Sequence, residues 1–202
     1  MSIFVILKAR DNIIMRTLTQ IANIQTGIYT KSESFGEIMY LQVKHFDENG
    51  VFISTFIPDL SLNPQIEKHL LLEGDILFAA KGTKNFAVKY DNKIGRCVAS
   101  STFLIIKIKK EFHNSIASDF ICWYLNHPKT QEILKSKARG SSMPSISKVD
   151  LMELELKIPS FEKQNLIIKI AFLQKKEQNI YKKLEQIKDK YIQNSLISAI
   201  NN

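Results

Sequence analysis

The last 43 residues of the chain, 160–202, contain neither glycine nor proline, and their apolar residues recur at alternating spacings of four and three. This heptad spacing continues for more than four repeats and is typical of a long helix that pairs with another helix. Ser160 follows Pro159 and can cap the first turn, so we expect a helix from Phe161 to about Ile197. The residues predicted to line the paired face are Leu166, Ile170, Leu173, Glu177, Ile180, Leu184, Ile187, Tyr191, Asn194 and Ser198.

The expected helix is too long for its apolar stripe to be covered by its own domain. The helix would measure roughly 55 Å at about 1.5 Å per residue, which exceeds the diameter of a small domain. It could lie along its own domain, but the stripe is too long to be covered there, so we expect a second helix to cover it. Three stripe positions are polar, which weakens the packing but can fix the register between two helices.

Residues 16–157 show a different pattern, in which short apolar runs alternate with turn signals such as Asn49-Gly50 and Gly74-Asp75. The β-branched and alternating runs favour strands, and other segments have helical periodicity. Strands are expected at residues 38–43, 51–57, 76–80, 86–90, 97–99 and 103–108, and helices near residues 18–23, 118–126 and 130–137. The predicted fold class is α+β: a mixed α/β domain over residues 16–157, then a long helical arm over residues 158–202, with residues 1–15 as an N-terminal extension.

The chain is basic, with 28 Lys and Arg against 20 Asp and Glu, which gives a formal net charge of +8. Residues 158–202 hold eight lysines and four acidic residues, so this arm carries half of the excess charge. A basic excess is consistent with a polyanionic partner such as nucleic acid, although it does not bear on the fold.

The cysteines and the apolar runs of the sequence indicate the cellular compartment in which the protein is expected. The two cysteines, Cys97 and Cys122, do not have the spacing of a disulfide framework or a zinc site, so we expect a reducing cytoplasm. No apolar run approaches the ~20 residues that a membrane span requires. The apolar run at residues 3–7 also lacks the flanking residues of a secretion signal. We therefore expect a cytoplasmic protein without a membrane partner.

Three loops combine backbone freedom with hydroxyl, amide and cationic side chains. Lysines in such loops suit phosphate contacts, whereas arginine and asparagine can form paired hydrogen bonds with bases. Loops of this composition also occur in domains that bind nothing. We predict that the cations Lys81, Lys84 and Arg139 lie on one face together with the polar residues near them. The residues predicted to contact DNA are Tyr29, Thr30, Lys31, Lys81, Thr83, Lys84, Asn85, Arg139, Ser141, Ser142 and Ser145.

Sequence motifs of enzymes are largely absent, including the nucleophile elbow, the phosphate-binding P-loop and the zinc-protease motif. One pattern, Glu155-Leu156-Lys157, has the E-x-K spacing of metal-dependent nucleases, in which an upstream aspartate such as Asp59 would complete the site. Glu155 and Lys157 also fit the solvent face of an alternating strand. A metal-dependent endonuclease is therefore an alternative; otherwise we expect neither a catalytic residue nor a metal site.

Several segments, taken in order, resemble the specificity (S) subunit of type I restriction–modification enzymes. They are the opening helix with its glycine at residues 17–27, the GDIL strand and turn at 72–82, the glycine–serine loop at 140–151, and the Ile-Pro lead into the long helix at 156–164. The resemblance covers residues 16–195. The usual member of that family has two recognition domains and two long helices, whereas this chain has one of each.

The resemblance implies a non-catalytic subunit that reads double-stranded DNA and gives target specificity to partner methyltransferase and restriction subunits. Those partners would carry the S-adenosylmethionine chemistry, and this chain would hold no cofactor. As a half-length form, it would pair with a second copy and read a bipartite inverted repeat. The implied interface consists of Leu166, Ile170, Leu173, Ile180, Leu184, Ile187 and Tyr191. A coiled-coil adaptor whose basic charge is incidental is a further alternative.

Overall fold

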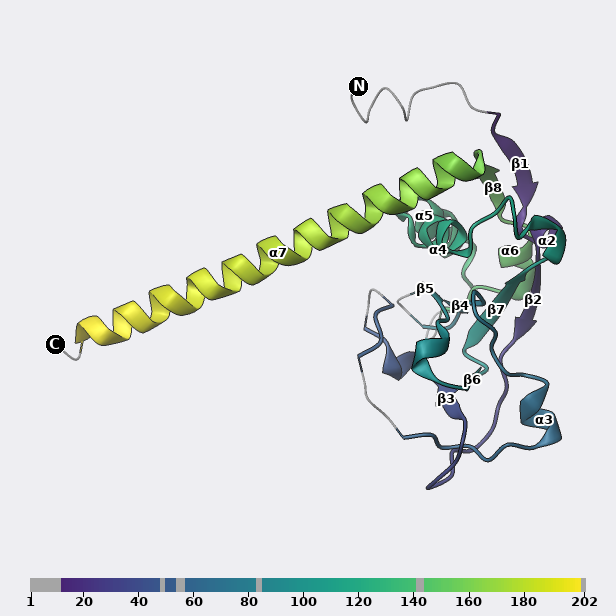
Figure 1. The fold of residues 1–202 in the computed structure, drawn as a ribbon, viewed down its shortest axis with the longest axis horizontal. Helices are drawn as coiled ribbons and strands as arrows, with labels where there is room; N and C mark the ends of the chain where they lie inside the picture. Colours follow the sequence, from purple (N-terminus) through teal and green to yellow (C-terminus); the bar gives the residue numbers. More distant parts are fainter. Residues whose placement is uncertain (1–11, 48–49, 54–56, 83–84, 141–143, 201–202) are drawn as a thin grey trace. The chain divides into compact units, whose positions relative to one another are not determined.

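The computed structural model describes residues 12–47, 50–53, 57–82, 85–140 and 144–200 (Figure 1). The chain divides into two units, the first ending at Gln164 and the second beginning at Asn165. The elements of the chain are β1 (Ile14–Thr17), α2 (Leu18–Ile21), β2 (Ala22–Thr26), β3 (Met39–Leu41), η1 (Val43–His45), α3 (Pro64–Glu67), β4 (Ile76–Ala79), β5 (Ala87–Lys89), η2 (Asn92–Ile94), β6 (Cys97–Ala99), β7 (Phe103–Ile108), η3 (Lys110–Phe112), α4 (Ser118–Asn126), α5 (Pro128–Lys137), α6 (Lys148–Met152), β8 (Glu155–Ile158) and α7 (Phe161–Ile200).

The first unit is built around a four-stranded antiparallel sheet in the order β2-β7-β4-β5. Ile106 of β7 pairs with Ile24 of β2 on one side and with Ile76 of β4 on the other. All four residues of β4 are buried, as are the first four of β7, because both faces of these central strands are covered. The expected mixed α/β fold is confirmed by this sheet and the helices packed around it.

Aromatic side chains form the core beneath one face of the sheet. The rings of Phe46 and Phe103 have centroids 5.8 Å apart, and those of Phe86 and Phe103 are 6.2 Å apart, both in edge-to-face orientations. Such pairs add about 0.5–1.5 kcal/mol to the stabilisation from burying their area. Phe46 belongs to the segment after β3, and Phe86 to the turn before β5, so this core fixes two loops against the sheet.

A second, two-stranded ribbon joins the beginning and the end of the first unit. β1 pairs antiparallel with β8, so that Ile14 lies opposite Ile158 and Met15 lies opposite Lys157 (Figure 1). The N-terminal extension expected over residues 1–15 therefore includes two residues of a strand. Along β8, Leu156 and Ile158 are buried while the alternate residues are exposed, as expected for an alternating strand.

The structure differs from the sequence predictions at three elements. The strand expected at residues 38–43 ends at Leu41, and Val43 begins η1. The helix expected at residues 18–23 ends at Ile21, because the next residues pair with β7 as strand β2. In the strand expected at residues 51–57, Phe52 forms an isolated bridge with Phe46 and belongs to no described strand, and residues 54–56 lie outside the described residues. The Asp47 carboxylate accepts a hydrogen bond from the Val51 amide at 2.8 Å, so the start of this segment is a turn.

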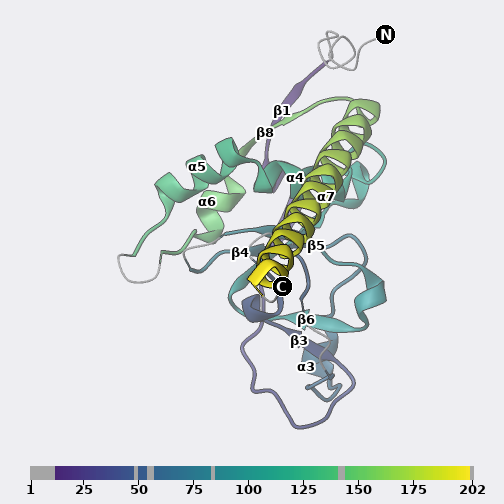
Figure 2. The same cartoon turned by 90° about the vertical axis from the view of Figure 1, so that its left-hand side faces the viewer.

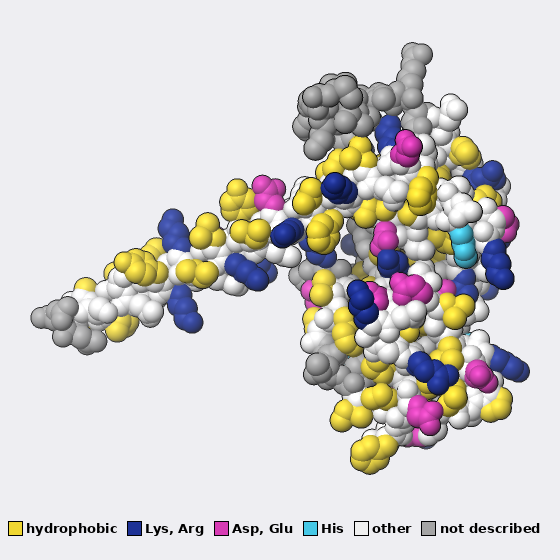
Figure 3. Space-filling model, in the orientation of Figure 1, with side chains coloured by type: hydrophobic (Ala, Val, Ile, Leu, Met, Phe, Trp, Pro, Cys, Tyr) yellow, Lys and Arg dark blue, Asp and Glu magenta, His cyan; other side chains and the backbone are white. Residues whose placement is uncertain are grey.

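The long helix is confirmed as α7, which has 40 residues and measures about 60 Å at 1.5 Å per residue. On the predicted apolar stripe, Leu173, Ile180, Leu184 and Ile187 are each more than half exposed. Figure 3 shows apolar and basic side chains along this helix. In the part of the chain that the structure describes, no helix combines the length and hydropathy needed to cross a bilayer.

Gln164 anchors the first turn of α7 to the first unit. Its side chain is fully buried; Oε1 accepts from the Ala117 amide at 3.0 Å, and Nε2 donates to the carbonyls of Ser115 and Pro159 at 2.8 and 2.9 Å. These bonds explain why the unit ends at Gln164 and not after residue 157, where the sequence suggested a boundary.

We expect Gln164→Leu to lower the free energy of unfolding by about 2 kcal/mol, since it removes three part-buried hydrogen bonds at about 0.5–1.5 kcal/mol each. Urea unfolding followed by the fluorescence of Trp123 measures this change. Gln174→Leu, at an exposed position of the same helix, is the matched control. Equal stabilities of the two variants would contradict the anchoring role.

Candidate nucleic-acid interface

Three of the central strands bring their adjoining loops to the same end of the sheet. Thr26, the last residue of β2, pairs with Leu104, and Ala79, the last residue of β4, pairs with Phe103. Because β7 runs antiparallel to both neighbours, the segments that follow β2 and β4 and the segment that precedes β7 leave from one end. Two of the three loops singled out in the sequence follow β2 and β4.

Backbone hydrogen bonds tie the third loop to this end as well. Ala80 donates to the carbonyl of Thr102 at 3.1 Å, and Ile146 donates to the carbonyl of Ala80 at 2.9 Å. The segment between α5 and α6 therefore passes beside the end of β4, although it lies about 60 residues further along the chain (Figure 2). Ser145 forms bridges with both Lys81 and Arg139, and we refer to these three residues as the Lys81–Arg139–Ser145 cluster.

The two cations of this cluster are exposed, and neither forms an ion pair with another described residue. A carboxylate lies within electrostatic range: the Ser147 hydroxyl donates to Asp150 and lowers the pKa of that carboxyl, and the charges of Arg139 and Lys137 lower it further. Asp150 is thus ionised at neutral pH. Two cations against one carboxylate leave this surface positive on balance.

Asn85 has a structural role that the sequence did not indicate. Its Nδ2 donates to the carbonyl of Ala79 at 2.8 Å, which closes the turn between β4 and β5. One of its two amide hydrogens is therefore used inside the protein, and no other described residue bonds to the second amide hydrogen or to the oxygen. Thr83 and Lys84 of the same turn, and Ser141 and Ser142 of the other loop, lie outside the described residues.

The segment after β2 is fixed at this end by close packing. Gly27 lies very close to the segment between β6 and β7. A Cβ atom at position 27 would lie 2.2 Å from the carbonyl oxygen of Ser100 in that segment. The Tyr40 hydroxyl donates to the carbonyl of Ile28 at 2.9 Å and accepts from the amide of Thr30 at 3.4 Å. Tyr29 is consequently held with 82% of its surface exposed.

Lys31 of this segment is also exposed. None of the hydrogen bonds found among the described residues joins Tyr29, Thr30 or Lys31 directly to the Lys81–Arg139–Ser145 cluster. The structure therefore brings the predicted residues to one end of the sheet as two groups.

Sequence reasoning missed the residues between those two groups. The hydroxyls of Ser100 and Thr102 are hydrogen bonded at 2.6 Å, and Ser100 forms a bridge with Ile28 while the Thr102 carbonyl accepts from Ala80. The run Ser100-Ser101-Thr102, three consecutive hydroxyl residues between two predicted strands, was the available signal.

The residues of the endonuclease alternative do not converge on one site. The Asp59 carboxylate accepts from the Tyr40 amide at 2.8 Å beside β3, whereas Glu155 and Lys157 lie on β8 in a different sheet. Among the residues that the structure describes, no group of three His, Cys, Asp or Glu side chains could hold a metal ion. The metal-dependent alternative therefore has no assembled site to support it.

Comparison with solved structures places the fold among the specificity subunits of type I restriction–modification systems. The S subunit from M. genitalium matches with a TM-score of 0.56 and 16% sequence identity, over 83% of this chain and 40% of that one. The HsdS subunit from Thermoanaerobacter tengcongensis matches with a TM-score of 0.54 and 16% identity, over 86% of this chain and 40% of that one. This chain thus spans less than half the length of these similar structures.

A sequence comparison gives the family directly. The model of the type I restriction modification DNA specificity domain matches residues 11–189, and the chain therefore belongs to this family. Among curated proteins, none matches the chain.

Proposed function

We propose that the chain recognises double-stranded DNA and supplies target specificity to the methyltransferase and restriction subunits of a type I restriction–modification system. The observation that carries this proposal is the Lys81–Arg139–Ser145 cluster, which lies with other polar loops at one end of the central sheet in a chain of the DNA specificity family. The exposed cations suit phosphates, and the hydroxyl and amide groups around them suit base edges.

The partners of the proposed complex follow from the exposed stripe of α7. Within the proposal, this stripe pairs with the same stripe of a second copy, and the paired helices also hold the methyltransferase subunits. A similar solved structure concerns complex assembly and conformational transition of the type I system, which supports an assembling role for this family. The chain itself acts without catalysis, and its partners bind S-adenosylmethionine.

A salt titration of DNA binding tests the interface. We expect Lys81→Ala and Arg139→Ala each to reduce the slope of log affinity against log salt by about 1, because each removes one phosphate contact. Fluorescence anisotropy with a labelled duplex gives the slopes. Lys93→Ala is the matched control, since Lys93 follows β5 at the opposite end of the sheet. An unchanged slope in the double variant would place the DNA surface elsewhere.

The same assay separates this proposal from a coiled-coil adaptor with incidental charge. Selection of bound duplexes from a random library should enrich a defined sequence with the unaltered chain. A chain that binds DNA by its charge alone would enrich none, because phosphate contacts carry no sequence information.

A further inference from the structure

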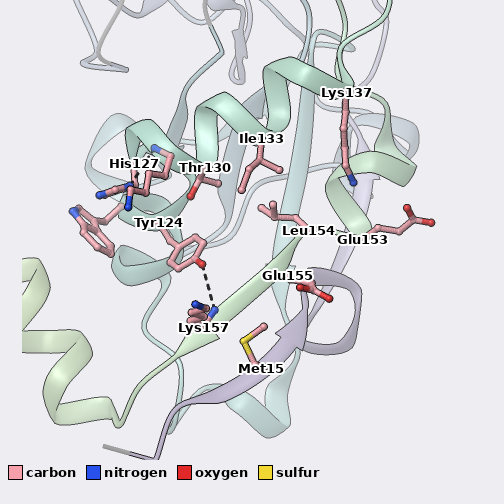
Figure 4. A pocket seen from close by; sticks show the side chains of 12 residues that line it. Met15, Tyr124, His127, Thr130, Ile133, Lys137, Glu153, Leu154, Glu155 and Lys157 are labelled. Carbon is pink, nitrogen blue, oxygen red and sulfur yellow. Dashed lines mark hydrogen bonds between the residues drawn. The ribbon is translucent and has the colours of Figure 1, made fainter. Parts of the chain in front are cut away.

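A pocket of about 630 Å³ lies in the first unit between helices α4 and α5 and the β1–β8 ribbon (Figure 4). Its volume falls in the range of small-molecule sites, about 300–1,000 Å³. Neither the proposed DNA interface nor the stripe of α7 uses it. Its lining contains three lysines, two glutamates, an aromatic group and a helix N-terminus, and these features are distributed unevenly.

One end of the pocket is suited to an anion. Helix α5 begins there with His127 as its cap and Pro128 in its first turn, so the positive end of the helix dipole points to this region. Figure 4 shows Tyr124, His127 and Thr130 at this end, with Lys157 below them. The Tyr124 hydroxyl is near the Lys157 amide, which donates to it at 3.4 Å. Two cations, Lys129 and Lys157, line this end.

Thr130 is the independent sign that a ligand belongs here. Its side chain is 95% buried yet lines the pocket, and among the described residues its hydroxyl has no hydrogen-bond partner. Threonine in a helix can bond its hydroxyl to a carbonyl one turn earlier, but Thr130 makes no such bond. The hydroxyl is reached from the pocket, so a ligand oxygen there can accept its hydrogen bond.

The pocket also offers an aromatic surface. The ring of Trp123 lies 5.4 Å from that of His127 and 6.3 Å from that of Tyr124, so three rings form a cluster in the wall. Met15 and Ile133 add apolar surface. Aromatic and apolar walls of this kind bind planar rings, and stacking of a base on an aromatic ring contributes about 1–3 kcal/mol.

The two carboxylates of the pocket differ in position. Figure 4 shows Glu153 near Lys137, at the end opposite His127, and Glu155 between Leu154 and Met15, two residues from Lys157 on the same exposed face of β8. These carboxylates repel a second phosphate but accept hydrogen bonds from hydroxyl and amino groups. The pocket therefore combines a place for one phosphate, an aromatic wall, and acceptors for the donors of a sugar or base.

We propose that this pocket binds a nucleotide, with its phosphate against Thr130, Lys129 and Lys157 and its base against the Trp123 cluster. The same chemistry can come from a free mononucleotide or from one nucleotide unit of a DNA strand. Thr130 and Lys157 bind the phosphate in either case. The inference does not rest on the proposed DNA interface.

Trp123 is the single tryptophan of the chain, so its fluorescence reports on this pocket directly. Titration of the full chain with AMP is expected to change the Trp123 emission with saturation in the millimolar range or below, and calorimetry checks the affinity independently. Adenosine, which lacks the phosphate, should bind at least tenfold more weakly, because hydrogen bonds to charged groups are among the strongest.

Two substitutions test the phosphate site. Thr130→Val keeps the shape but removes the hydroxyl, and Lys157→Met removes an exposed charge without disturbing the core; each should weaken AMP binding about tenfold, which corresponds to one lost charge-assisted bond. Thr130→Ser, which keeps the hydroxyl, should restore binding. Lys93→Met, outside the pocket, should have no effect.

The source of the nucleotide is decided by a parallel titration with single-stranded and double-stranded oligonucleotides. Weaker DNA binding by Thr130→Val and Lys157→Met, without any AMP binding, would assign the pocket to a nucleotide of the DNA. AMP binding that these variants weaken, with DNA binding unchanged, would assign it to a free nucleotide. The proposal is overturned if the variants bind both AMP and the oligonucleotides as tightly as the unaltered chain does. It is also overturned if adenosine binds as tightly as AMP.

Discussion

The double substitution Leu184→Lys and Ile187→Lys is expected to make the chain monomeric under conditions in which the unaltered chain is a dimer. These side chains are 59% and 66% exposed on α7, and burial of each against a partner helix is worth about 1.5–3 kcal/mol. A two-fold dimer contains four such side chains, so their loss removes about 6 kcal/mol or more, a factor of about 10⁴ in the dissociation constant. Size-exclusion chromatography with light scattering measures the masses.

The control for this experiment adds the same charge away from the stripe. Gln178 and Gln193 do not belong to the four-and-three spacing, so replacing both with lysine should leave the dimer intact. An unaltered chain that is monomeric at roughly ten times the concentration of its DNA-binding assays, without other subunits, would argue against pairing of two copies.

Deleting residues 180–186 should shorten the spacer between two recognised half-sites while leaving the half-sites themselves unchanged. If two copies pair through antiparallel helices, a two-fold axis relates their recognition domains, and the DNA target must share that symmetry. Removing one heptad keeps the stripe in phase but shifts each domain by roughly 10 Å along the helix at about 1.5 Å per residue. This shift corresponds to about 3 base pairs at roughly 3.4 Å each.

Sequencing of duplexes selected from a random library by the two chains measures the spacer. A deletion of residues 180–182 provides the contrast, because three residues break the heptad phase and should abolish pairing. A deletion that alters the half-sites and keeps the spacing would argue against a helix that sets the distance. An asymmetric target for the unaltered chain would argue against a symmetric pair.

The elements that the sequence predicted well are those with a strong local pattern. Helix α4 has the predicted bounds at Ser118 and Asn126, and strand β7 has those at Phe103 and Ile108. Helix α7 begins at Phe161 as expected. In each case the periodicity of the apolar residues and the flanking Pro or polar residues indicate the same element with the same bounds. Local preference and tertiary packing therefore favour the same structure.

Features that depend on distant parts of the chain could not be predicted. The bridge from Ser145 to Lys81 joins residues 64 positions apart, and no local pattern specifies it. Gln164 reads as a surface residue of a polar helix, but the amide and carbonyls that bury it belong to other segments. The pocket beside Thr130 was likewise invisible, because its walls come from α4, α5 and both strands of the β1–β8 ribbon.

The β1–β8 ribbon has a consequence for how such domains can be exchanged. Because Ile14 and Ile158 lie side by side, the chain enters and leaves the recognition domain through one joint. A domain of this kind can be inserted into another chain, or repeated in tandem, when the ribbon and the Gln164 anchor just after it are both kept. Grafting residues 14–164, which keep the Gln164 anchor, onto the rest of another α7-like helix should therefore transfer the target preference, which makes the ribbon a suitable junction for recombination.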